Sequence, residues 1–134
     1  MINRVEKLSL LSEMIAFAKY DKDIKNIEYN FLLGVARQLE ISREDFEYLI
    51  EHPVMYTHLK SHSERIVQFH RLVLLMNIED SGDASKGATK LYNFGLRMGL
   101  SHESISKVLY LMESFPNKIV PPDVLIDIFK TQYN

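Results

Sequence analysis

Apolar residues recur along most of this chain at intervals of three and four positions, the spacing that gathers side chains on one face of an α-helix. The pattern is clearest between residues 10 and 39, where two apolar segments flank an acidic turn at Asp21-Lys22-Asp23. Further helical segments begin near residues 41, 61, 84, 101 and 121. Because no segment alternates with a period of two, the sequence predicts an all-α bundle of six or seven helices.

Capping and proline chemistry predict several helix boundaries. Asp23 is a suitable N-cap for the second helix, because its carboxylate can accept from amides of the first turn. Ser42, followed three residues later by Asp45, resembles a capping box and starts the third helix. This helix should end at His52, since the residue before a proline, here Pro53, avoids the helical region.

The second half of the chain repeats the first at an offset of 59 positions. Residues 14–50 align with residues 73–109 without a gap, which places Asp21 over Asp80 and matches two Ser-x-Glu sequences that each follow an apolar residue. Two copies are too few for a solenoid, so the halves are expected to share one core. The prediction is a single domain, 1–134, with related three-helix halves at about 5–52 and 63–115 and a closing helix at about 121–131.

Composition excludes some classes of function. The chain has 134 residues, enough for one domain with a real core, and a formal net charge of -2, which argues weakly against general nucleic-acid binding. It has no cysteine, so disulfides and thiolate metal sites are impossible. No segment approaches the roughly 20 apolar residues of a membrane span, and no signal peptide is recognisable. A soluble, cytoplasmic protein is expected.

The motif M-I-A-x-A-x-x-D, which ends at Asp21, is followed by an acid seven residues later, Glu28, then by an apolar helix and L-x-I-S. This pattern resembles the tellurite-resistance TerB-like family over about 8–112. The family usually has glycine directly after the aspartate, where this chain has Lys22. In the second half Gly87 stands at the position that matches Glu28.

The resemblance implies an all-helical fold with two related halves and a non-enzymatic binding function in bacterial stress response. It also implies that the acidic turns bind a divalent cation, and clustered carboxylates suit hard cations such as calcium or magnesium. The metal ligands predicted in this way are Asp21, Glu28 and Asp80, with Asp23 and Asp83 assisting. An EF-hand is excluded, because the sixth and twelfth positions from Asp21 are Asn26 and Leu32.

Two alternatives stay open for the acidic turns and for the protein as a whole. Asp23 and Asp83 could simply cap helices while the other acids are solvated. The protein could also be an interaction module without metal, which binds an unknown protein partner or forms a homodimer. Such a module would use an apolar surface between the halves or along the last helix, Val124 to Phe129.

Other candidate motifs favour structure over chemistry. The segment from Gly82 to Thr89 has the glycine spacing of a phosphate loop, but Ala88 replaces the lysine and a helix precedes it instead of a strand. Its glycines are expected to form a tight turn between helices. His58 and His62 lack the glutamate of a zinc protease, and these two are predicted, with His52 and His70, to be surface histidines. Three basic residues are expected on solvated helix faces: Lys60, Arg65 and Arg71.

Overall fold

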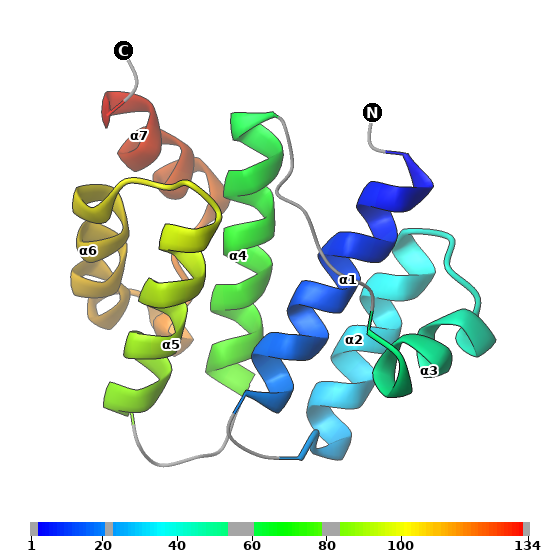
Figure 1. Cartoon of the computed structure of the whole chain (residues 1–134). Helices are drawn as coiled ribbons and strands as arrows, with labels where there is room; N and C mark the ends of the chain where they lie inside the picture. Colours follow the sequence, from blue (N-terminus) through cyan, green and yellow to red (C-terminus); the bar gives the residue numbers. More distant parts are fainter. Residues whose placement is uncertain (1–2, 21–22, 54–60, 79–83, 133–134) are drawn as a thin grey trace. The chain divides into compact units, whose positions relative to one another are not determined.

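Every element of the computed structural model is helical within the residues that it describes, 3–20, 23–53, 61–78 and 84–132. The elements are α1 (Arg4–Lys19), α2 (Asn26–Gln38), α3 (Arg43–Glu51), α4 (His62–Ile78), α5 (Ala84–Arg97), α6 (His102–Leu111), the 3-10 helices η1 (Met112–Ser114) and η2 (Pro116–Lys118), and α7 (Pro122–Gln132) (Figure 1). The predicted all-α fold with six or seven helices is confirmed. None of these helices combines the length and the apolar character needed to cross a bilayer.

The chain divides into two compact units, Met1–His58 and Leu59–Asn134. In the first unit, each of α1, α2 and α3 packs against the other two. In the second unit, α5 packs against α4 and α6, and α7 packs against the same two helices (Figure 1). The closing helix α7 therefore belongs to the second unit, where it buries Leu125, Ile128 and Phe129.

The structure carries the internal repeat that the sequence predicts. Adding 59 to the bounds of α1, α2 and α3 gives residues 63–78, 85–97 and 102–110. The observed bounds of α4, α5 and α6 differ from these by no more than one residue at either end. Each unit is thus built on the same three-helix pattern, and α7 is an addition to the second.

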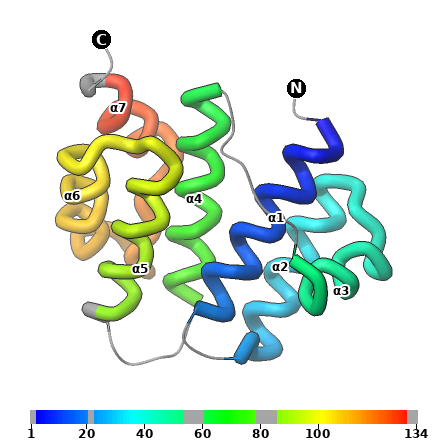
Figure 2. The backbone as a smooth tube through the Cα atoms, in the orientation of Figure 1, coloured from blue at the N-terminus to red at the C-terminus, as the bar shows by residue number. Residues whose placement is uncertain are grey.

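The repeat extends to the backbone of the α2–α3 and α5–α6 connections, which Figure 2 traces. Each connection has one left-handed residue, Glu40 with φ 60° or Gly99 with φ 82°. The next amide donates to the carbonyl five residues earlier, at 2.8 Å in the first unit and 3.1 Å in the second. The following serine, Ser42 or Ser101, caps the next helix by accepting at 3.1 Å from the amide three residues on. This pattern satisfies orphan backbone groups at both helix ends.

Two predicted caps differ from the structure in instructive ways. Asp23 does not cap α2, because the helix begins at Asn26 and its N-cap is Lys25. Ser42 does cap α3, but the Asp45 carboxylate contacts Arg4 at 2.8 Å. A long-range ion partner has therefore taken the carboxylate that a capping box would use locally.

The environments of Gly87 and of two arginines also correct the sequence prediction. Gly87 lies inside α5 and does not form a turn. Arg65 and Arg71 are half-buried instead of solvated. Arg65 Nη1 donates to the Met98 carbonyl at 3.2 Å, and Arg71 Nη1 donates to the Gln68 amide oxygen at 3.3 Å. Both are structural side chains of the second unit; Lys60 lies outside the described residues.

Candidate metal site

The structure places two of the five predicted metal ligands. Asp21, Asp80 and Asp83 lie outside the described residues. Asp23 and Glu28 both belong to the first unit, on either side of the point where α2 begins. The geometry of the proposed site can therefore be built from these two residues upward.

Glu28 is the third residue of α2, and its side chain is fully buried. Its Oε1 accepts a hydrogen bond from the Lys25 backbone amide at 3.0 Å. This is the contact that an acid at the third helical position makes when it reaches back to the N-cap, and the helix dipole favours a negative charge there. Because burial of a carboxylate is costly unless it is hydrogen-bonded, this contact fixes where the carboxylate can lie.

Asp23 is exposed and lies three residues before the first residue of α2. With Asp23 in solvent and Glu28 at the helix N-terminus, each acid is accounted for without a metal ion. Within the described ranges, no three His, Asp or Glu side chains approach one another closely enough to form a metal site. A cation at this turn would therefore depend on Asp21 for a further ligand.

The second unit lacks a counterpart of the buried glutamate. The position that matches Glu28 is Gly87, and a Cβ added there would lie 3.2 Å from both Cγ and Sδ of Met76. A longer side chain would have to displace Met76 from its place beside α5. At this matching position the two units thus differ, with a buried carboxylate in the first and no side chain in the second.

His62 and His70 were predicted at the surface, and the structure shows both half-buried in α4. The His62 ring lies edge-on to Phe129 of α7, with 6.4 Å between ring centroids. A signal in the sequence could have found them, since each histidine is four residues from Ile66, a buried member of the same apolar stripe. His52 is exposed, as predicted, and so is His102; His58 lies outside the described residues.

The structure describes part of the segment that resembles a phosphate loop, Gly82 to Thr89. Residues 84–89 belong to α5, so this part of the motif is helix and cannot wrap a phosphate as a loop does. Gly82 lies outside the described residues. Where the structure describes it, the motif therefore forms the first turns of α5.

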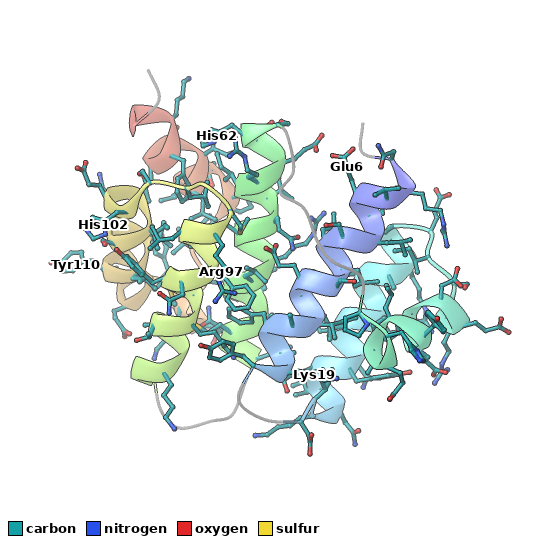
Figure 3. The ribbon with its side chains drawn as sticks, in the orientation of Figure 1. Glu6, Lys19, His62, Arg97, His102 and Tyr110 are labelled. Carbon is teal, nitrogen blue, oxygen red and sulfur yellow. The ribbon has the colours of Figure 1, made fainter. Side chains whose placement is uncertain are left out.

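The apolar stripe of the last helix is occupied within its own unit. Leu125, Ile128 and Phe129 are buried, so they are not a surface for a partner in the folded second unit. Among the described side chains of this unit, the large apolar ones that remain exposed lie one on each α-helix: Val67, Leu96, Tyr110 and Ile126. Tyr110, which is 81% exposed, extends away from α6 (Figure 3).

Comparisons with protein-family models, with curated proteins and with solved structures returned no match for this chain. Its function is therefore inferred from the chemistry and geometry of its own residues. The features that bear on function are the buried carboxylate at the start of α2 and the exposed apolar side chains of the second unit.

Proposed function

We propose that this chain is a non-enzymatic, TerB-like helical domain that binds a divalent cation, calcium or magnesium, at its first acidic turn. Asp21, Asp23 and Glu28 would supply the carboxylate oxygens. The observation that supports the proposal best is the burial of the Glu28 carboxylate at the first turn of α2, next to the turn that carries the two aspartates. The stress-response context comes from the family resemblance.

A buried carboxylate can serve both as a helix cap and as a metal ligand. Its two oxygens together offer about four lone-pair positions, so a hydrogen bond to the Lys25 amide is compatible with metal coordination by the same group. A bound cation would offset the cost of keeping the negative charge away from water. Hard cations with oxygen ligands fit this chemistry, and the lack of cysteine in the chain removes thiolate competitors.

The second acidic turn, with Asp80 and Asp83, has an assisting role in this proposal. Its counterpart of Glu28 is Gly87, so the position that supplies the buried carboxylate in the first unit has no side chain in the second. We therefore expect Asp21→Asn to weaken cation binding more than Asp80→Asn does. Equal losses would instead indicate that both turns contribute ligands to the same degree.

The proposal is tested by thermal unfolding of the full chain while calcium, magnesium, manganese and zinc are titrated separately. A cation present at about 100 times its dissociation constant should stabilise the folded state by about 2.7 kcal/mol. Asp21→Asn should abolish this gain. Glu28→Gln is the sharper variant, because glutamine retains a cap acceptor but removes the charge. Asp127→Asn, which changes an exposed acid of α7, is the matched control.

An unchanged melting temperature with every ion, in the native chain and in Asp21→Asn alike, would overturn the cation proposal. The alternative would then be a protein-interaction module without metal. The observation that favours this alternative is the exposure of Tyr110, together with one large apolar side chain on each of the other helices of the second unit.

A further inference from the structure

A histidine of α4 contacts each end of the segment that forms α7. Toward the C-terminal end of α7, the ring of Phe129 meets His62 edge-on and also meets Phe69, with 5.7 Å between the latter centroids. Just before α7 begins, His70 hydrogen-bonds the backbone of Val120. Figure 3 shows His62 at the N-terminal end of α4. The two imidazoles thus lie where the closing helix is attached.

The environment of His70 favours the neutral ring. Its Nε2 is buried and has no hydrogen-bond partner among the described residues, so the bond to Val120 is made through Nδ1. A proton added at Nε2 would place a charge and a donor where the described residues offer no acceptor, which is costly. Burial is the largest influence and lowers the pKa of His70; the bond to Val120 raises it, and the charge of Arg71 lowers it.

The pKa of His62 is shifted in the same direction, downward. Burial lowers the pKa of His62, and the nearby charge of Arg65 lowers it further. No carboxylate among the described residues raises the pKa of either imidazole. The charged residues on α4 and on the helices packed against it are Glu64, Arg65 and Arg71 of α4, the bases Lys86, Lys90 and Arg97 of α5, and the exposed Asp123, Asp127 and Lys130 of α7.

We propose that acidification releases α7 from α4 through protonation of His62 and His70, while the first unit stays folded. In the first unit, the matching positions are Asn3 and Leu11, which do not titrate. Release would expose the apolar face around Phe129. This device goes beyond cation binding and does not depend on it.

The direction of the pH effect follows from the lowered pKa values. Released imidazoles titrate near 6.5, and the packed ones titrate at a lower pH. The attachment of α7 is therefore fully stable above about pH 6.5 and weakens as the pH falls from there toward the folded-state pKa. For each imidazole, a packed-state pKa that is lower by one changes the equilibrium between attached and released α7 by up to about tenfold.

Hydrogen exchange of the full chain, measured at about pH 7.5 and about pH 5 and corrected for the intrinsic exchange rate, tests the release of α7. We expect amides of α7 to lose protection by about tenfold or more at the lower pH, while amides of α2 change by less than about twofold. An equal loss in α2 and α7 would overturn the proposal, because acid would then act on the whole chain.

Substitution of both histidines identifies the titrating groups. The variant with His62→Gln and His70→Gln should lose most of the pH difference in α7, whereas the exposed-site control His102→Gln should keep it. A pH difference that persists in the double variant would overturn the proposal. If that variant fails to fold, an NMR titration of the imidazole Cε1 protons in the native chain decides: pKa values at or above about 6.5 for both rings contradict it.

Discussion

The two units have the same three-helix pattern but hold their first and third helices together differently. In the first unit, α1 packs directly against α3, and Arg4 pairs with Asp45 at 2.8 Å. At the matching positions of the second unit stand Ser63 and Ser104, which cannot form an ion pair. There α7 packs against both α4 and α6 and joins them through apolar contacts. The two units thus share their helices and connections. They differ in how the first and third helices are joined, by direct packing in the first unit and by α7 in the second.

The shared connection between the second and third helices also tolerates different chemistry in the two units. Gly99 adopts its left-handed backbone without strain. The absence of a side chain also leaves room for Arg65, because a Cβ added at Gly99 would lie only 2.8 Å from Arg65 Nη1. Glu40 adopts the same conformation at a cost of about 1–2 kcal/mol. The first unit therefore carries a strain that the second avoids, and its packing must compensate for it.

Removal of the Phe129 side chain should lower the stability of one unit relative to the other by the largest amount. Phe129 is fully buried in α7 and contacts Phe69 of α4. Phe129→Ala should lower the free energy of unfolding of the second unit by about 3–5 kcal/mol, because it removes a large side chain and leaves a cavity. Urea denaturation would give the loss, and hydrogen exchange in α5 and α2 would show which unit carries it.

Ile126→Ala is the control on the same helix, since Ile126 is 46% exposed and its loss should change stability by less than about 0.5 kcal/mol. A similar loss of protection in α2 and α5 of the Phe129→Ala variant would show that the units unfold as one. A loss below about 1 kcal/mol would mean that α7 does not hold the core of the second unit together.

The sequence predicted what depends on local chemistry. Residue type and spacing predicted the cap at Ser42, the end of α3 before Pro53, the start of α6 near residue 101 and the repeat itself. Each of these features depends on hydrogen bonds or steric limits within a few residues. For that reason the predicted helix boundaries near them agree with the observed ones.

The errors arose where a competing local contact or long-range packing decides. Asp23 was expected to cap α2, but the buried carboxylate of Glu28 reaches back to Lys25 and sets the start of the helix. His62 and His70 were placed at the surface although their spacing from Ile66 puts them on the apolar stripe of α4, because that spacing does not say which helix covers them. Their burial depends on a helix some 50 to 60 residues further along the chain, a distance over which single-residue propensities carry no information.

A smaller effect is expected where one unit has glycine and the other alanine. A Cβ at Gly95 of α5 would lie 2.7 Å from Ile105 Cδ1 and 3.0 Å from Phe69 Cε1. Gly95→Ala should therefore destabilise the second unit by about 1–2 kcal/mol, since overpacking exceeds the gain in helix propensity. Ala36→Gly, the reverse change at the matching buried position of α2, should cost about 1 kcal/mol.

Thermal unfolding of both single variants checks this pair. Destabilisation by both opposite changes would show that each unit is packed for its own residue. A gain in stability for Gly95→Ala would mean instead that Ile105 moves aside without cost and that the two positions are interchangeable.

The smallest effect is expected for the ion pair that distinguishes the first unit. The double substitution Arg4→Ser and Asp45→Ser copies the residues of the second unit into the first. Both side chains are about half-exposed or more, at 59% and 50%, so solvent screens the pair and its loss should cost at most about 1 kcal/mol. A double-mutant cycle at low and high salt measures the coupling, which should shrink as salt rises. A coupling energy well above about 1 kcal/mol that is insensitive to salt would mean that the first unit depends on this pair as the second depends on α7.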